Sequence, residues 1–347
     1  MGNITYSSIS EIHNALMERR HSPKELYEYI TSNYFAWVAD NSLDKIRGSE
    51  AEFHNLSVEF SRQDCEPYAA MVASIGVNEY PLSTDLLADL IKYSQETGDA
   101  EQCTQGFNQL KKIDRKYWSW RTFVFAIDFL KDGLSSSPSV EKFENNLTEA
   151  KVLIEDFKKY IPYEERAYVA EAELYQNQGD FAKAKAALQI GIKKVAVAPQ
   201  CCMKLADMSL KLGRYDDVIK YARQGILAAT QDQPTISVGY LHYILALAMD
   251  AKRIQCRQAG QSFDEIEIRK IINEFTTADR LLINEGRPDV AYRRTIKARL
   301  IVLEMEENIA VEIDQPDNKE THEGSPVRLS DILQIQQMLE NAKKGVL

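Results

Sequence analysis

The sequence has little of what strands, membrane helices and secretion signals require. Only 15 Gly and 10 Pro occur among 347 residues, which is sparse for an all-β protein and favours long helices. The longest apolar run, Phe123 to Leu130, contains Asp128 and is far shorter than the roughly 20 residues that cross a bilayer. Glu11 and Glu18 stand where a signal peptide would have its apolar region. We therefore expect a cytoplasmic protein without membrane contact.

The sequence also lacks the motifs of metal sites and of common enzymes. Its five cysteines have no paired spacing, and its five histidines are scattered without metal-ligand spacing. No P-loop, H-E-x-x-H, G-x-S-x-G or C-x-x-C motif occurs. The sequence thus predicts no catalytic residue, no metal and no cofactor, and we expect a protein that is not an enzyme.

The charge of the chain disfavours nucleic acid as a partner. The formal net charge is -10 and the pI is near 5.2, and phosphate groups repel such a surface unless a local basic patch compensates. Hydrophobic residues nevertheless make up 44% of the chain, which is enough for a sizeable core. We expect a folded protein whose partner is another protein or a peptide.

A period of 34 residues relates two segments in the middle of the chain. Gly179 and Gly213 are 34 positions apart, and an aromatic residue follows two positions after each. From each aromatic residue, small or apolar residues recur at steps of 3, 4 and 3, which is one face of an α-helix. The two series are Phe181, Ala184, Leu188, Gly191 and Tyr215, Val218, Ala222, Gly225. Ahead of the glycines, Ala172 and Ala206 stand at equivalent positions.

This pattern resembles the tetratricopeptide repeat, a hairpin of two helices, A and B. The resemblance implies an all-α fold, a right-handed superhelix (α-solenoid) of such hairpins with helical N- and C-terminal caps. Gly179 and Gly213 would supply the tight turn, where a left-handed conformation needs no Cβ. Ala172 and Ala206 would let the two helices approach closely, and the aromatic residue after the turn would pack back onto helix A.

Weaker copies of the pattern extend the predicted array over residues 80–308. Stacking of hairpins needs only matched apolar faces, so the flanking copies tolerate more variation. Their series are Ala100, Cys103, Phe107, Leu110, then Val140, Phe143, Leu147, Ala150, then Ile268, Ile271, Phe275, Ala278.

Residues 1–79 form a predicted N-terminal helical region. Helical patterns cover Ile9 to Arg19, Ser22 to Val38 and Glu50 to Arg62. The stretch Ile12 to Ile30 resembles the first two helices of a helix-turn-helix domain, although Tyr27 stands where those domains have a small residue. Residues 1–60 carry five basic against nine acidic residues, which suits DNA contact poorly. A helical cap on the solenoid is the plainer interpretation.

The C-terminal part divides into an acidic linker at 309–327 and an amphipathic helix at 328–347. Eight acidic residues and one lysine fall between positions 304 and 323, a composition typical of a mobile linker. The helix is predicted to cap the last hairpin, with the protein's own groove or a second copy of the chain, giving a homodimer, as alternatives. Its apolar residues are Leu329, Ile332, Leu333, Ile335, Met338 and Leu339.

Two further clusters have both a structural and a functional interpretation. Around position 120, helical spacing predicts that Trp120 and Phe123 are core residues, while Trp118 and Arg121 face the groove or solvent. Residues 251–300 hold eleven basic against seven acidic residues, and Arg293 to Arg299 is the densest part. This basic segment is either a solvated helix face, paired with the acidic linker just downstream, or a patch for an acidic peptide.

In tetratricopeptide arrays the concave wall comes mainly from helix A, so positions 2, 5, 9 and 12 of each repeat, counted with the turn glycine as 15, are expected to face a partner. The acidic side chains among them favour a partner segment with basic residues. The Lys and Asn by which the chaperone-binding class of these repeats grips a carboxylate are replaced, so that activity is not expected. The expected partner-binding residues are Arg166, Val169, Glu173, Gln176, Gln200, Met203, Asp207, Leu210, Lys92 and Gln95.

The function that the sequence favours is a protein-protein interaction scaffold or adaptor, with the partner held in the groove of the array. Two alternatives stay open. One is a peptide-responsive transcriptional regulator whose N-terminal helices bind DNA, and the other is a regulatory subunit of a larger effector complex.

Overall fold

The computed structural model describes residues 9–19, 25, 48–62, 65–135, 139–229, 237–285 and 291–307. The chain divides into two compact units, unit 1 (Met1–Leu174) and unit 2 (Tyr175–Leu347). The described residues form helices and no strand. The predicted helix from Ser22 to Val38, the linker at 309–327 and the C-terminal helix at 328–347 lie outside the described residues.

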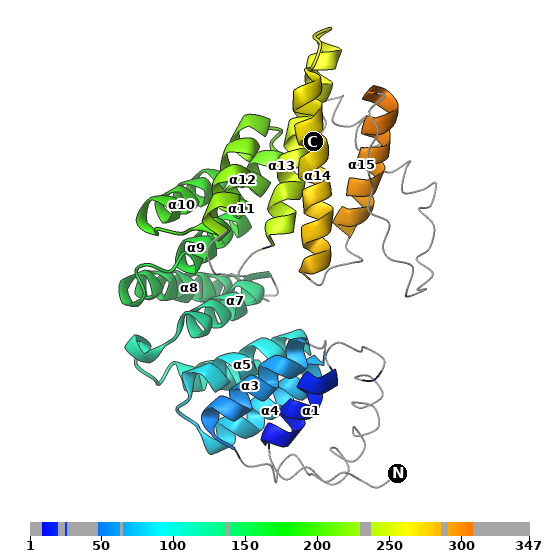
Figure 1. The fold of residues 1–347 in the computed structure, drawn as a ribbon. Coiled ribbons are helices and arrows are strands. Elements are labelled where there is room, and N and C mark those ends of the chain that lie inside the picture. The colour runs from blue at the N-terminus through cyan, green and yellow to red at the C-terminus, as the bar shows by residue number, and fades with distance from the viewer. Residues whose placement is uncertain are drawn as a thin grey trace. The chain divides into compact units, whose positions relative to one another are not determined.

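Unit 1 is a series of helices in which α1 packs on α3, each helix from α3 to α6 packs on the next, and α7 packs on α8 (Figure 1). The A helices α3, α5 and α7 also pack on one another, as expected of stacked hairpins. The first two predicted helices with described bounds, α1 and α3, begin and end where the sequence indicated. The helices are α1 (Ile9–Arg19), α3 (Glu50–Arg62), α4 (Glu66–Glu79), α5 (Thr84–Glu96), α6 (Ala100–Leu110), α7 (Trp120–Ser135), α8 (Val140–Tyr160) and α9 (Arg166–Asn177), with the short 3-10 helix η2 (Arg115–Tyr117) before α7.

Unit 2 repeats this arrangement, and its A helices α11, α13 and α15 pack successively on one another. The prediction of an all-α fold made of consecutive tetratricopeptide-like hairpins is confirmed in both units. The helices are α10 (Phe181–Lys194), α11 (Pro199–Lys211), α12 (Tyr215–Ala229), α13 (Val238–Gln258), α14 (Glu265–Asn284) and α15 (Ala291–Glu307).

Four turns between an A helix and a B helix use a glycine in the left-handed region. Gly98, Gly179, Gly213 and Gly260 have φ angles of 78°, 75°, 65° and 72°, a conformation that costs a residue with Cβ about 1 kcal/mol or more. A Cβ built on any of them meets nothing within 4 Å, so the requirement comes from the backbone alone. The predicted turns at Gly179 and Gly213 are therefore confirmed.

The aromatic residue after the turn does not behave as the sequence predicted. Phe181 is 60% exposed, and Tyr215 is only half-buried, so packing back onto helix A is wrong for Phe181. Both stand at the first position of their B helix, where the side chain lies at the edge of the hairpin. The next residues of each series carry the packing, because Ala184, Leu188, Val218 and Ala222 are fully buried.

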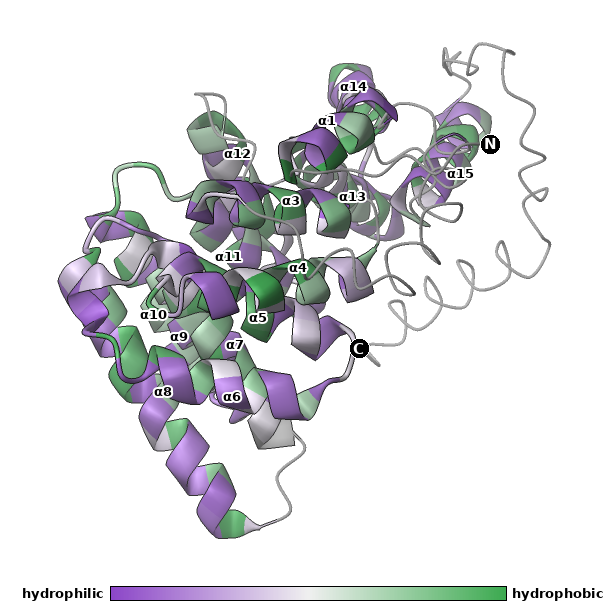
Figure 2. Cartoon of the chain, turned by 90° about the horizontal axis from the view of Figure 1, so that it is seen from below, coloured by the Kyte–Doolittle hydropathy of each residue, from purple (hydrophilic) through white to green (hydrophobic). Residues whose placement is uncertain are grey.

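The core of unit 1 runs through all its helices, from Ile9 of α1 to Leu174 of α9. The hydropathy colouring follows this core: α8 is largely hydrophilic in its first half and buries apolar residues only from Ala150 onward (Figure 2). The assignment of the tryptophans was partly wrong. Trp118 is only 3% exposed and packs on Phe123, while Trp120 is half-buried. Trp118 precedes the helix, so helical spacing could not place it.

The basic segment at 251–300 is largely a set of internal ion pairs of unit 2. Arg293 donates to Asp279 at 2.6 Å, and both are buried. Arg299 donates to Asp250, which also accepts from the fully buried Arg253 at 2.9 Å. Arg253 and Arg257 in turn contact the acidic pair Glu306 and Glu307 at the end of α15. The predicted pairing with the acidic linker lies outside the described residues, and the acidic partners seen here belong to α15. Arg293 and Arg299 are too buried to form a solvated face or a patch for a peptide.

No helix of the described residues is long and apolar enough to span a membrane.

Candidate functional site

The A helices of unit 1 enclose a buried carboxylate, Asp89 of α5, in a polar network. The Nδ1 atom of His54 lies 2.6 Å from its Oδ2, which also accepts a hydrogen bond from Ser57 Oγ at 3.0 Å. Its Oδ1 accepts a hydrogen bond from Arg121 Nη2 of α7 at 2.8 Å. These donors offset the cost of burying the Asp89 charge, whose side chain has no exposed area. The hydrogen bond to Asp89 raises the pKa of His54 above its usual value.

Two of the expected partner-binding residues, Lys92 and Gln95 of α5, contact α7. The Lys92 ammonium lies 5.3 Å from the centre of the Phe125 ring, and the Arg121 guanidinium lies 5.2 Å from the same ring. Gln95 donates to Asp132 through Nε2. Lys92 and Gln95 are both half-buried. Because both contact α7, they lie on one face of unit 1 together with Arg121 and Phe125.

Glu173 of α9, an expected anchor for a basic partner residue, is already paired within unit 1. Lys131 of α7 donates to Glu173 at 2.5 Å and to Asp128 at 2.7 Å. Burial raises the pKa of Asp128, and the Lys131 charge acts in the opposite direction. A basic residue of a partner would have to compete with Lys131 for the Glu173 carboxylate.

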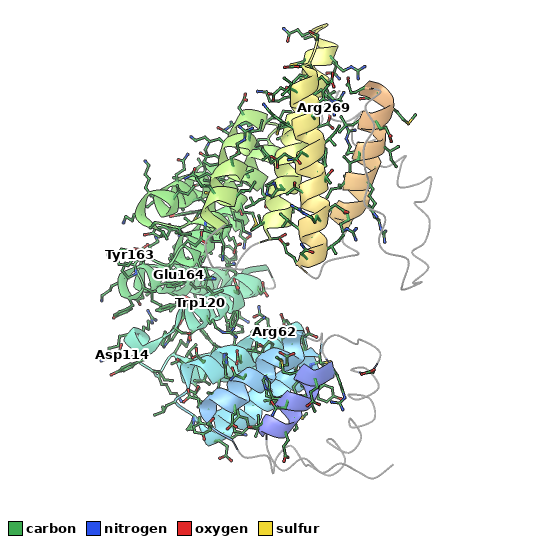
Figure 3. All side chains as sticks on the ribbon, viewed as in Figure 1. Arg62, Asp114, Trp120, Tyr163, Glu164 and Arg269 are labelled. Carbon is green, nitrogen blue, oxygen red and sulfur yellow. The ribbon has the colours of Figure 1, made fainter. Side chains whose placement is uncertain are left out.

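Arg166 and Val169, at the start of α9, lie apart from these contacts. The Arg166 guanidinium lies 3.8 Å from the centre of the Trp120 ring and donates to Glu164 at 2.7 Å. Trp120 and Glu164 are close together in Figure 3. Val169 is only 8% exposed. Val169 therefore offers little surface to a partner, and Arg166 is engaged by its own neighbours.

The A helices of unit 2 carry a group of tyrosines beside Asp207. We call Asp207 of α11, Tyr240 and Tyr243 of α13, and Tyr292 of α15 the tyrosine face. The ring centres of Tyr240 and Tyr292 are 5.1 Å apart, those of Tyr243 and Tyr292 are 5.3 Å apart, and those of Tyr240 and Tyr243 are 6.1 Å apart. The Tyr240 hydroxyl donates to Asp207 Oδ1 at 2.7 Å. Three successive A helices thus converge on one polar and aromatic surface.

The tyrosine face is partly exposed, and its carboxylate forms no ion pair with a described residue. Tyr292 is 37% exposed, and Tyr240, Tyr243 and Asp207 are half-buried. Burial raises the pKa of Asp207, although the Tyr240 hydrogen bond opposes this change. Burial also raises the pKa of Tyr240 and of Tyr243, so both hydroxyls stay protonated at neutral pH.

The other expected residues of unit 2 lie at the same level of burial. Gln176 at the end of α9, and Gln200, Met203 and Leu210 of α11, are all half-buried. Of the expected unit 2 residues, Asp207 is the one that the structure joins to the tyrosines.

Sequence reasoning placed Arg121 toward the groove or solvent but missed Phe125 in unit 1 and all three tyrosines in unit 2. In unit 2 the cause is helix length. The turn glycine after α13 is Gly260, with a φ angle of 72°, but α13 has 21 residues against 13 in α11. When Gly260 is counted as position 15 of the repeat, positions 2, 5, 9 and 12 therefore all fall after Tyr240. The spacing of Tyr240 and Tyr243, three apart on a helix, was the available signal.

Within the parts of the chain that the structure describes, no three His, Cys, Asp or Glu side chains lie close enough to hold a metal ion.

No model of a protein family and no curated protein matches the sequence. Among solved structures, the chain is similar to a thermophilic tetratricopeptide repeat protein of Thermus thermophilus, with 17% identity over 58% of this chain and 99% of the other, at a TM-score of 0.46. It is also similar to a tetratricopeptide repeat protein of Parabacteroides merdae, with 13% identity over 80% of this chain and 98% of the other, at a TM-score of 0.44. The hairpins and glycine turns described above carry the assignment of the fold.

Proposed function

We propose that the protein is an interaction scaffold that binds a segment of a partner protein on the tyrosine face of unit 2. The observation that carries this proposal is the convergence of three tyrosines from α13 and α15 on the carboxylate of Asp207. Tyrosines are favoured where partners bind, because their rings give a large contact area at little cost in conformational entropy. Their hydroxyls also give a partner polar groups to bond.

The surroundings support a binding surface that is formed before the partner arrives. Tyr240 is held by Asp207, and the rings of Tyr240 and Tyr243 both pack on Tyr292 of α15. Side chains that are fixed in this way lose little freedom when a partner binds, which favours affinity. The faces of unit 1 differ, since Glu173 and Asp89 already hold cations of their own chain.

Selection of peptides from a random displayed library by the full chain tests the proposal. Wild-type protein should enrich a set of related peptides over a column that carries an unrelated protein. Tyr292→Ala should lower the affinity for the enriched peptides about tenfold or more, the loss typical of a central aromatic residue. Tyr163→Ala is the matched control, because Tyr163 of unit 1 is 81% exposed and should leave the affinity unchanged.

The absence of any enriched peptide would contradict the proposal. Equal losses for Tyr292→Ala and Tyr163→Ala would also contradict it, because the binding surface would then not be the tyrosine face. Circular dichroism of each variant verifies that the helices are intact.

A further inference from the structure

We infer that the tyrosine face takes an arginine side chain of the partner, with the guanidinium hydrogen-bonded to Asp207 and stacked on the outer side of a tyrosine ring. This inference rests on the proposed function and adds the chemistry of the residue that is bound. Two observations carry it, namely a carboxylate without a cation and the spacing of the three rings.

Asp207 is a half-buried carboxylate that no cation of the described chain contacts. Its one hydrogen bond comes from the Tyr240 hydroxyl to Oδ1, and Oδ2 accepts none from the described residues. Lys204 and Lys211, on the same helix, favour its charged form only from a distance, and burial outweighs them in raising the pKa of Asp207. A cation from outside the chain would therefore remove an unfavourable interaction that the folded protein keeps.

Other buried carboxylates of unit 2 do not share this property. Asp250 accepts a hydrogen bond from Arg253 at 2.9 Å, and Asp279 accepts one from Arg293 at 2.6 Å. Asp250 and Asp279 are thus each paired with an arginine of the chain, whereas Asp207 is not. Asp207 is hydrogen-bonded to Tyr240, whose ring packs on the exposed ring of Tyr292.

The spacing of the rings selects the shape of the cation. Centres 5.1 to 6.1 Å apart place the rings in contact with one another, so they leave no cage that could enclose a trimethylammonium group. A planar guanidinium can lie flat on the exposed side of a ring and donate two hydrogen bonds to a carboxylate. A lysine ammonium can do only part of this, and arginine is therefore the expected residue.

The peptides enriched by the full chain provide the probe. Arginine should recur at one position among them, and a synthetic peptide with citrulline at this position should bind about tenfold more weakly, as expected for the loss of one charge-assisted contact. Lysine at this position should give an intermediate loss. Asp207→Asn should weaken binding of the arginine peptide by the same factor and should bind the citrulline peptide as well as wild type does.

Asp216→Asn is the matched control, because it removes the same charge from an exposed ion pair with Lys252 in unit 2 and should leave the affinity unchanged. Losses for citrulline and for Asp207→Asn that simply multiply would overturn the inference, since the two groups would then not interact. Enriched peptides without a recurring arginine would also overturn it, while the proposed function would stand. The failure to enrich any peptide would instead remove the proposed function.

Discussion

The A helices of the two units have similar backbones, but their carboxylates differ in how they are paired. In unit 1, Asp89 holds Arg121 and His54, and Glu173 holds Lys131, so the carboxylates of this surface are neutralised by the chain itself. In unit 2, Asp207 is hydrogen-bonded to a tyrosine and forms no ion pair with a cation of the described residues. The difference indicates that the charges of unit 1 stabilise the packing of A helix on A helix, whereas we propose that the charge of Asp207 is available to a partner.

The largest effect is expected at the centre of the unit 1 network. Asp89→Ala removes the acceptor for Arg121, Ser57 and His54 and leaves a guanidinium without its counter-charge. Loss of one partner of a buried ion pair costs about 3–5 kcal/mol, so the free energy of unfolding in urea should fall by that amount. Glu101→Ala, at an exposed position of α6, is the control and should change it little. A loss as small as that of the control would show that the network does not stabilise unit 1.

A smaller loss is expected where the charges of unit 1 are partly exposed. Lys131→Met leaves Asp128 and Glu173 without their shared cation and should cost about 1–2 kcal/mol in the free energy of unfolding. The pKa of Asp128 should rise further, because Lys131 now opposes the effect of burial. Chemical-shift titration of Asp128 by NMR measures this change. An unchanged pKa would mean that Lys131 and Asp128 do not interact in solution.

In unit 2, removal of a carboxylate charge should raise the free energy of unfolding rather than lower it. Asp207→Asn keeps an oxygen for the Tyr240 hydroxyl and removes an uncompensated charge, so the free energy of unfolding at pH 7 should rise by about 1 kcal/mol. Because the pKa of Asp207 is raised in the folded state, wild type gains stability relative to the variant as pH falls through this raised pKa toward the usual value of 3.8. A destabilised Asp207→Asn protein would contradict the contrast between the units.

The smallest effect should come from His54. Its pKa is raised by Asp89, so its contribution to stability is complete below the usual value of 6.5 and is lost as pH rises through the raised pKa. Wild type should therefore lose up to about 1 kcal/mol relative to His54→Gln over this range, as measured by thermal unfolding at a series of pH values. Parallel curves for the two proteins would exclude a stabilising His54 cation.

The fold was predictable because its signals are local. Gly179 and Gly213 mark turns that only the backbone requires, and the steps of 3 and 4 residues mark the buried faces. The site was predictable only in part, since exposure and pairing depend on neighbours that are distant in sequence. Glu173 and Asp207 stand at equivalent repeat positions, but only Glu173 meets a lysine, and Tyr292 reaches the tyrosine face from a helix with no glycine landmark. The count of charged residues in 251–300 likewise did not indicate that Arg293 and Arg299 are buried and paired.

The most direct measurement compares Glu173→Gln and Asp207→Asn for the same enriched peptide by fluorescence polarisation. Each variant removes one acidic charge from an equivalent position of an A helix without changing the shape of the side chain. We predict that Asp207→Asn weakens binding about tenfold, while Glu173→Gln stays within about twofold of wild type, because Lys131 already neutralises Glu173. Equal losses, or a larger loss for Glu173→Gln, would contradict the assignment of the partner surface to unit 2.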